Sequence, residues 1–388
     1  MRKRGAQRTF WASLALLVYL YLVFPLLVVL RGALRGRPVR RGRSQPTVSL
    51  IIAAHNEEAL IVQKLLNALE LDYPPKQLEI IVASDGSDDQ TNELVSGFAS
   101  RGVRLLALPR QGKNATLNAA AATSSGQILV FNDADMAIAP DSLSTLVAAF
   151  EDPDVGGIAG ERRHRGHASR SPLARMLGHA SQTFQKLLSQ GGSVTIAGLL
   201  YAIRREHFRP VPANVVDDFF IPAQVILDKR RLVFDHRATT YPLGPPRRVG
   251  APFVRTLRMN VQYLRSYVHL AGLFNPFGSG FYSIQILSHK VLRRFLIIPF
   301  TALLMSGLVL WRTASVYRIV TLMQLALHGM ALAGLSVQSL GIKRVPLLRR
   351  VMTFDRELVA AGVALGAVFF ESASDRWDSH RVEDPPGT

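Results

Sequence analysis

The chain has 388 residues, of which 48% are hydrophobic, and it contains no cysteine. The absence of thiolates excludes a disulfide-stabilised scaffold, a cysteine-based zinc finger and an iron–sulfur protein. A formal net charge of +18 and a mean hydropathy of +0.17 occur together. This combination favours a membrane protein with basic flanks over a nucleic-acid-binding protein, so we expect no nucleic-acid partner.

The first predicted element is a membrane-spanning helix over residues 10–30. This run carries no charge and has the roughly 20 residues that a helix needs to cross a bilayer. Ten Lys and Arg residues and no acidic residue lie before residue 46, on both sides of the run, so they orient the helix only weakly. A cleaved signal peptide is the competing interpretation, but the run exceeds the usual apolar core of about 7–15 residues and no A-x-A site follows. We therefore expect residues 1–46 to form an N-terminal transmembrane helix with basic flanks.

Residues 47–250 are predicted to form a cytoplasmic α/β domain. Short, nearly continuous apolar runs, typical of parallel strands buried on both faces, alternate there with helical patterns. The alternation predicts a Rossmann-like, doubly wound, mostly parallel sheet, which binds its ligands at the carboxyl ends of its strands. The expected strands are 47–54, 78–84, 104–108 and 127–132, and the expected helices are 57–69, 91–100 and 114–122.

Two of these strands end in acidic residues. Asp85 follows the second strand, and Asp133 and Asp135 follow the fourth. In an Asp-x-Asp sequence at the end of a strand, alternate side chains point the same way, so both carboxylates can address one hard divalent cation and the phosphates bound to it. A surface turn is the alternative interpretation of either group.

A third acidic group is Asp217-Asp218, which apolar residues flank on both sides. Adjacent carboxylates in apolar surroundings suit a general base. The alternative is a pair of first-turn acids at a helix N-terminus, where the helix dipole favours negative charge. No Walker A sequence is present and no G-x-G-x-x-G follows the first strand, which disfavours an ATPase and a nicotinamide oxidoreductase.

Residues 251–371 are expected to return the chain to the membrane. Residues 251–294 predict interfacial amphipathic helices, whose basic side chains meet anionic head groups. Transmembrane helices are then expected at about 295–311, 319–337 and 358–370, of which the last is marginal as a span. The basic residues at 289–294 and 343–350 place both of those loops in the cytoplasm. Residues 372–388 are predicted to be a polar tail.

The order of these motifs resembles the membrane-bound family 2 glycosyltransferases with a GT-A fold, which include the cellulose, chitin, hyaluronan and poly-N-acetylglucosamine synthases. The resemblance covers about residues 48–299. The matching motifs, in chain order, are Ala54-His55-Asn56-Glu57, Asp85-Gly86-Ser87, Gly112-Lys113, Asp133 with Asp135, Asp217-Asp218, and Ser288 to Arg293 before a membrane helix.

The resemblance implies a role for each matching position. The donor-binding residues would be Ala54, Asn56, Glu57, Asp85, Lys113, Asp133 and Arg255, with Asp85 reading the nucleotide base. Asp133 and Asp135 would hold Mg²⁺ or Mn²⁺, with Asp135 as the direct ligand. The catalytic residues would be Asp218 as the general base, its neighbour Asp217, and Arg258 as the group that stabilises the departing diphosphate. Met259 stands where the family has a tryptophan, which departs from the pattern of the processive synthases.

These assignments predict an integral membrane, inverting glycosyltransferase. It would move a sugar from a nucleotide sugar, with a UDP-sugar as the first candidate, to a polysaccharide or lipid-linked acceptor and form a β-linked product. A glycolipid synthase that acts on a lipid hydroxyl is an alternative with the same donor chemistry. A non-catalytic, membrane-anchored nucleotide-sugar-binding protein is an alternative of a different class. Membrane lipids are expected partners, and a partner subunit or an oligomer could complete a pore for a polymer.

Overall fold

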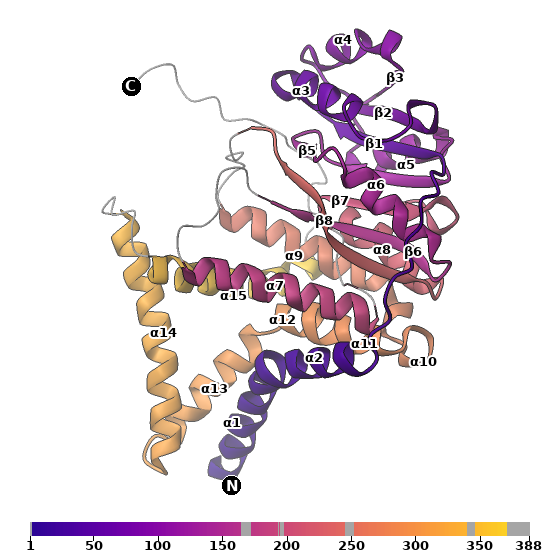
Figure 1. Ribbon diagram of the computed structural model, residues 1–388. Coiled ribbons are helices and arrows are strands. Elements are labelled where there is room, and N and C mark those ends of the chain that lie inside the picture. Colours follow the sequence, from indigo (N-terminus) through magenta and orange to yellow (C-terminus); the bar gives the residue numbers. More distant parts are fainter. Residues whose placement is uncertain are drawn as a thin grey trace. The chain divides into compact units, whose positions relative to one another are not determined.

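The computed structural model describes residues 2–163, 172–192, 194, 198–244, 252–339 and 346–370. The predicted polar tail, residues 372–388, lies outside the described residues. The chain forms two compact units (Figure 1). We call Leu27–Val249 with Arg265–Ile286 the sheet unit, and we call Met1–Leu26 with Gly250–Leu264 and Leu287–Ala373 the helical unit.

The described part of the sheet unit is built on one mixed sheet. Its strands are β1 (Val48–Ala54), β2 (Leu78–Asp85), β3 (Val103–Leu108), β4 (Ile128–Asn132), β5 (Met136–Ile138), β6 (Val155–Arg162), β7 (Leu200–Arg204) and β8 (Arg231–Pro242). They lie in the order β3-β2-β1-β4-β7-β6-β8-β5. The four strands from β3 to β4 are parallel neighbours, as predicted. β7 is antiparallel to β4 and β6, β8 is parallel to β6, and β5 is antiparallel to β8.

The sheet is mixed because β7 runs antiparallel to both of its neighbours, β4 and β6, and because β5 is antiparallel to β8. The chain between β4 and β5 is also too short for a parallel crossover. Only Asp133, Ala134 and Asp135 separate the two strands, whereas a crossover needs a dozen or more residues. β5 therefore pairs with β8 at the other edge of the sheet, with Met136 opposite Pro242. The mostly parallel arrangement that the sequence predicts holds for one half of the sheet and not for the other.

The sheet unit also contains helices. They are α3 (Glu58–Leu69), α4 (Thr91–Ser96), α5 (Lys113–Thr123), α6 (Ser142–Val147), α7 (Pro172–Gly191), α8 (Asp217–Leu227), α10 (Pro276–Ser279) and α11 (Phe281–Ile286). Of these, α3 to α8 pack against the sheet. β1 is buried along its whole length, and its alternate residues Val48, Leu50, Ile52 and Ala54 share one apolar core with residues of α3 and α6. A one-residue slip of β1 would turn these side chains to the other face, so the apolar core specifies the register.

The helical unit contains most of the apolar helices. Its elements are α1 (Arg2–Val18), a π-helical turn (Tyr19–Val23), α12 (Leu292–Arg294), α13 (Ile297–Val309), α14 (Ser315–Ser339) and α15 (Pro346–Phe370). α2 (Phe24–Leu34) and α9 (Pro252–His269) each contribute residues to both units. Phe10 of α1 is fully buried against Leu303, Leu310 and Tyr317, so the first helix packs with the C-terminal ones.

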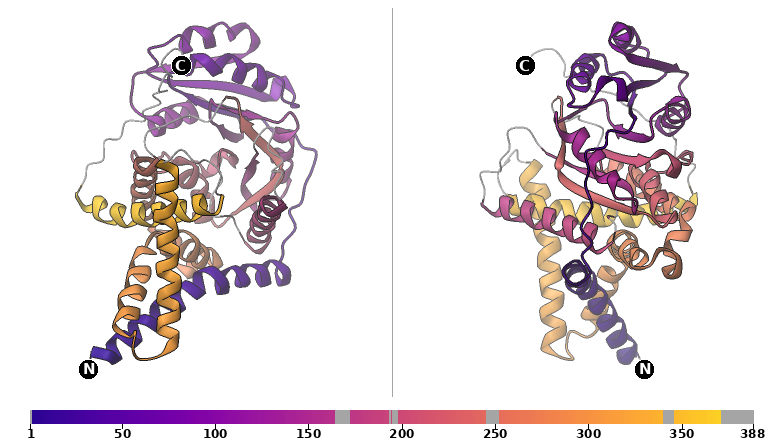
Figure 2. Two further views of the ribbon diagram at one scale, coloured as in Figure 1. Left: turned by 90° about the vertical axis from the view of Figure 1, so that its left-hand side faces the viewer. Right: turned by 45° about the vertical axis from the view of Figure 1, so that its right-hand side comes forward.

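By length and composition, two of the described helices are able to cross a membrane, namely Lys3–Leu34 and Ser315–Ser336. A third span is available if Phe281–Arg294 and Ile297–Val309, a pair bent by 61°, count as one. The predicted segment 358–370 is the second half of α15, whose first half carries Arg349, Arg350, Asp355, Arg356 and Glu357. α15 is not among the helices that are long and apolar enough, and it runs across α14 (Figures 1 and 2).

Candidate active site

The Asp-x-Asp turn joins β4 to β5 at the carboxyl end of β4. The amide of Met136 donates to the carbonyl of Asp133 (3.1 Å), and the amide of Leu243 donates to the carbonyl of Asp135 (2.9 Å). The backbone of the turn is therefore held both from within and from the end of β8. The side chain of Asp133 is 32% exposed, at the edge of the sheet where the parallel strands end.

Lys113 connects two of the predicted motifs. It is the first residue of α5, and its Nζ lies 2.9 Å from Oδ1 of Asp133 and 3.1 Å from Oδ2 of Asp217. Burial lowers the pKa of Lys113, but the attraction of the two carboxylates outweighs it and holds the pKa above its ordinary value. An ammonium ion therefore bridges the Asp-x-Asp turn and the Asp-Asp pair.

Asp217 and Asp218 form the first turn of α8. The N-terminus of a helix favours negative charge, which explains why two adjacent carboxylates are tolerated there. Behind them, Phe219 and Phe220 are buried. The two acids are therefore first-turn residues of a helix, and this position does not exclude a functional role. The contact of Asp217 with Lys113 connects them to the Asp-x-Asp turn.

The segment Ala54–Glu57 is tied to the loop after β2. Ala54 is fully buried and Glu57 is 1% exposed. Asn56 has a φ of 51°, and its Nδ2 donates to Oδ1 of Asp88 (2.6 Å) while the amide of Asp88 donates back to its Oδ1 (3.1 Å). The amide of Glu57 donates to Oγ1 of Thr91 (2.8 Å). The ends of β1 and β2 thus form one connected rim.

Asp85 directs its carboxylate to its own chain. The residue is fully buried, and its Oδ1 accepts from the amides of Gln111 (2.8 Å) and Gly112 (2.9 Å) and from the hydroxyl of Thr116 (3.1 Å). Its Oδ2 lies 3.1 Å from Nη1 of Arg110. These four donors occupy the acceptor positions that a carboxylate offers. Asp85 therefore holds the loop that leads into α5, and a contact with a nucleotide base would require the partly exposed Arg110 to move.

Lys64, which is not among the predicted site residues, contacts both ends of the Asp-x-Asp turn. It projects from α3, is fully buried, and donates from Nζ to Oδ1 of Asn132 and to the carbonyl of Met136 (2.7 Å). Burial lowers the pKa of Lys64 to about 7, against the attraction of Asp133 and Asp135.

One signal in the sequence could have identified Lys64. The buried stripe of α3 consists of Ile61, Lys64, Leu65 and Ala68, which is the i, i+3, i+4, i+7 spacing of a core-facing helix. A lysine in such a stripe is almost never fully buried unless it is paired, so its position alone predicts a buried acceptor.

Tyr201 is a further candidate residue of the site. It lies on β7, is 2% exposed, and stacks its ring on Phe131 of β4 with 5.0 Å between centroids. Its hydroxyl is buried and has no hydrogen-bond partner among the described residues. Burial raises the pKa of Tyr201 well above its ordinary value, and the charges of Asp217, Asp218 and Asp133 raise it further. The hydroxyl is therefore a protonated donor beside the acidic residues.

The two predicted arginines belong to the helical unit. Arg255 and Arg258 are on α9, in the segment Gly250–Leu264 of the helical unit, whereas the other predicted site residues belong to the sheet unit. Their roles toward a diphosphate stay predictions.

The donor set fits a hard divalent cation that a substrate completes. Asp133 and Asp135 offer carboxylate oxygens, the ligands that Mg²⁺ and Mn²⁺ prefer. Among the described residues, no group of three or more His, Cys, Asp or Glu side chains is arranged to hold a metal ion. Mg²⁺ is commonly bound by one or two carboxylates plus substrate phosphates instead of by a complete protein cage. The acidic pair is therefore sufficient if a diphosphate supplies the remaining ligands.

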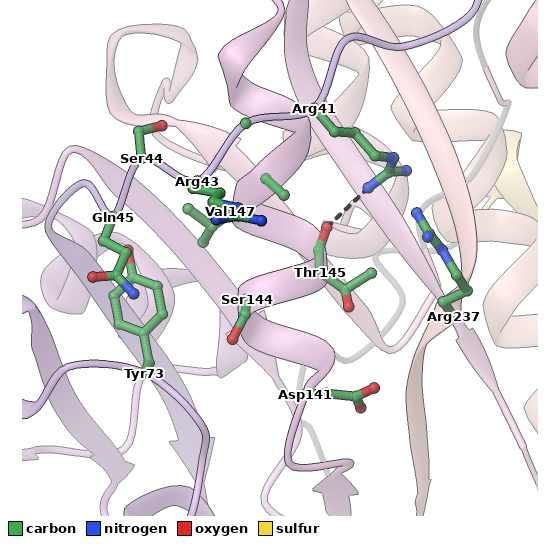
Figure 3. Close-up of a pocket in the computed structure, with 12 residues that line it drawn as sticks. Arg41, Arg43, Ser44, Gln45, Tyr73, Asp141, Ser144, Thr145, Val147 and Arg237 are labelled. Carbon is green, nitrogen blue, oxygen red and sulfur yellow. Dashed lines mark hydrogen bonds between the residues drawn. The ribbon is translucent and has the colours of Figure 1, made fainter.

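A pocket of about 450 Å³ lies elsewhere on the sheet unit (Figure 3). It is lined by the segment 41–45, Tyr73, residues of and near α6, and Arg237. Arg41 donates to the carbonyl of Thr145 (3.1 Å) and pairs with the buried Asp235, which also pairs with Arg237. None of the predicted site residues lines this pocket, so it is distinct from the acidic edge of the sheet.

The comparison with known proteins confirms the predicted family resemblance. Residues 49–209 match the family model described as Glycosyl transferase family 2. A stretch of 120 residues is 34% identical to the beta-monoglucosyldiacylglycerol synthase of Trichormus variabilis and covers 30% of this chain and 26% of that protein. A stretch of 208 residues is 25% identical to the poly-beta-1,6-N-acetyl-D-glucosamine synthase of Staphylococcus epidermidis and covers 51% of this chain and 50% of that protein. The chain thus spans half or less of the length of these relatives.

A solved structure shares the fold. The mannosyltransferase of Pyrobaculum calidifontis, determined in complex with GDP-mannose and Mn²⁺, superposes with a TM-score of 0.67 at 20% identity and covers 94% of this chain and 99% of its own. The mixed α/β sheet with its apolar helices therefore has the GT-A architecture. The Asp-x-Asp turn, Lys113 and the rim formed by β1 and β2 all lie within the matched residues 49–209, and this chain contains a glycosyl transferase family 2 domain.

Proposed function

We propose that this protein is an inverting, metal-dependent membrane glycosyltransferase that transfers a sugar from a nucleotide sugar to a lipid or polysaccharide acceptor. The observation that carries the proposal is the position of Lys113 between Asp133 and Asp217. This contact joins a diphosphate-and-metal motif to a candidate base motif at one edge of the sheet. The family match of residues 49–209, which include Lys113 and Asp133, supports a transferase in place of a binding protein.

The chemistry assigns each acidic residue a task. Asp218 takes the proton from the acceptor hydroxyl while the sugar–phosphate bond breaks, so one displacement inverts the anomeric carbon. Asp133 and Asp135 would hold Mg²⁺ or Mn²⁺, which when bound would offset the charge that develops on the departing diphosphate. Lys113 orients Asp133 and Asp217 and adds a positive charge beside the same phosphates. Asp85 shapes the donor site through the loop before α5, and Ala54, Asn56 and Glu57 form its rim.

Arg255 and Arg258 are proposed to add positive charge to the diphosphate from α9. Arginine suits this task because its planar guanidinium matches phosphate oxygens in a bidentate manner. Met259 follows them in place of an aromatic residue, which favours transfer of single sugars over retention of a long polymer.

The acceptor is proposed to be the hydroxyl of a lipid or lipid-linked sugar, and the alternative is a growing polysaccharide. The similarity to a glucosyldiacylglycerol synthase supports the first and the similarity to a poly-N-acetylglucosamine synthase supports the second. Two candidate membrane-spanning helices support a membrane location, and the basic loops favour a catalytic unit on the cytoplasmic side. A partner subunit or an oligomer enters the proposal only if the product is a polymer.

The test uses the purified full chain in nanodiscs with Mn²⁺ or Mg²⁺. Radiolabelled UDP-sugars and GDP-mannose are supplied one at a time, the last because the similar fold was solved with it, and release of nucleoside diphosphate is measured. We expect release from one donor, and a loss of at least about a thousandfold in Asp218→Asn, since the base is removed while the shape is kept.

The matched control is Asp154→Asn, which neutralises an acid that is 60% exposed and lies outside the candidate site. It should leave release unchanged. Label that extracts into organic solvent identifies a lipid acceptor, and label of high molecular weight identifies a polymer. Binding of a nucleotide sugar without release from any donor would contradict the proposal and favour a non-catalytic binding protein.

A further inference from the structure

We propose that Lys64 is a positioning residue for the Asp-x-Asp turn, which its buried ammonium group holds at both ends. The inference deepens the proposed function, because the metal site belongs to that function. Nothing in the order of motifs points to this lysine, which lies on α3, far from the turn in sequence.

The side chain of Lys64 forms hydrogen bonds to the residues on both sides of the turn. Asn132 is the last residue of β4 and Met136 is the first residue of β5, so they flank the turn that carries Asp133 and Asp135. Nζ of Lys64 donates to the side chain of Asn132 and to the backbone of Met136, at 2.7 Å in the second case. Nζ of Lys64 therefore bridges the two ends of the turn and restrains the directions of the two carboxylates between them.

The first partner of Lys64 is itself fixed. Nδ2 of Asn132 donates to the carbonyl of Leu199 (2.8 Å) and to Oγ1 of Thr240 (3.3 Å), and Thr240 donates in turn to the carbonyl of Ala137 (2.6 Å). Lys64, Asn132 and Thr240 are all buried. The network thus ties α3, β4, β5 and β8 together under the metal site, and buried networks of this kind lose much when one member is left unsatisfied.

The charge of Lys64 serves the same end. Two carboxylates on a three-residue turn repel each other before a cation binds, and a buried ammonium group beneath them reduces that repulsion. At the same time, a fixed positive charge opposes the binding of Mn²⁺. Loss of the charge should therefore raise the affinity for Mn²⁺, and loss of the two hydrogen bonds should lower it. The direction in which the Mn²⁺ affinity changes identifies the role of Lys64.

The experiment compares Lys64→Met with Leu65→Ala in the purified full chain. Methionine keeps an unbranched side chain of similar length and removes the charge and the donors. Leu65 is the next residue of α3 and is fully buried in the apolar core, so its truncation destabilises the same helix without removing a hydrogen bond from the turn. Two quantities are measured, namely amide exchange of residues 133–138 without metal, and the dissociation constant for Mn²⁺ by electron paramagnetic resonance, with and without UDP.

We expect Lys64→Met to speed amide exchange at residues 133–138 at least about tenfold and to weaken Mn²⁺ binding by about 10–100-fold, the usual effect of losing a group that orients a metal ligand. Leu65→Ala should leave the Mn²⁺ constant within about twofold. Unchanged exchange in Lys64→Met, tighter Mn²⁺ binding, or equal weakening in both variants would overturn the inference. If Lys64→Met does not fold, Lys64→Leu, which also removes the charge and the donors, takes its place with the same criteria. Failure of the wild type to bind Mn²⁺ would contradict the proposed function and leave the exchange result to decide the role of Lys64.

Discussion

The hydroxyl of Tyr201 is a buried donor that the fold does not use. The replacement Tyr201→Phe removes it and keeps the ring that stacks on Phe131. Because the hydroxyl has no hydrogen-bond partner among the described residues, we expect the thermal unfolding midpoint to stay the same or rise. We expect kcat/KM to fall about tenfold, since the hydroxyl lies within the electrostatic influence of Asp217 and Asp218 and is available to a bound substrate oxygen through one hydrogen bond of about 1.4 kcal/mol. A lower midpoint with unchanged kcat/KM would instead assign the hydroxyl to the fold.

The residues of the candidate site differ in how far the sequence could predict them. Asp133 and Lys113 follow parallel strands, whose carboxyl ends meet at one edge of the sheet, so their proximity was within reach of sequence reasoning. Asp217 begins α8, and its contact with Lys113 does not follow from the strand pattern. Asp85 was predicted to face a base, but its hydrogen bonds depend on the path of residues 110–112, which no local pattern specifies. Lys64 needs Asn132 as a partner, and that pairing exists only once α3 packs on the sheet.

Among the elements, the turn after β2 depends on a glycine. Gly86 has a φ of +60°, and a Cβ there would lie 2.6 Å from the amide nitrogen of Arg110, whose side chain pairs with Asp85. Gly86→Ala should therefore destabilise the sheet unit by about 2–4 kcal/mol, from a left-handed backbone and a clash with main chain that cannot simply rotate away. Chemical denaturation measures this loss.

Gly102→Ala is the control. Gly102 has a φ of +86°, but an added Cβ would have nothing within 4 Å, so only the backbone cost of about 1 kcal/mol applies. Equal losses in the two variants would show that the contact with residue 110 is unimportant.

The predicted strands and helices of the first half of the sheet unit agree with the structure to within a few residues, because each buried parallel strand is a continuous apolar run that local sequence reveals. β1 was expected at 47–54 and spans Val48–Ala54, and the helix expected at 114–122 spans Lys113–Thr123. The second half was not predicted in the same way. The antiparallel placement of β7 between β4 and β6 is a long-range pairing, which local sequence does not reveal. The three-residue connection before β5 carries no pattern that indicates the strand with which β5 pairs.

At the scale of the whole molecule, charge and hydropathy predicted where long apolar helices lie. They were less successful in predicting how many of these helices are able to span a membrane. The runs at 10–30 and 319–337 fall within helices that are able to span a membrane, because a long uncharged run has no other stable environment. The segment 358–370 gave a weaker signal, and its first helical turns lie upstream in a charged stretch that a short apolar window does not include. A helix with one charged half that runs across α14 is better suited to the membrane interface than to a span.

The absence of cysteine makes this arrangement testable, since each introduced thiol is unique in the chain. Arg43→Cys lies in the exposed segment before β1, Thr313→Cys in the turn between α13 and α14, and Gly366→Cys near the end of α15.

With the catalytic unit in the cytoplasm, a membrane-impermeant maleimide should label Thr313→Cys in intact cells and Arg43→Cys only after permeabilisation. If α15 lies in the interface on the cytoplasmic side, Gly366→Cys stays unlabelled from outside. Labelling of Gly366→Cys in intact cells would mean that α15 crosses the membrane. Labelling of Arg43→Cys in intact cells would mean that the whole protein has the opposite orientation.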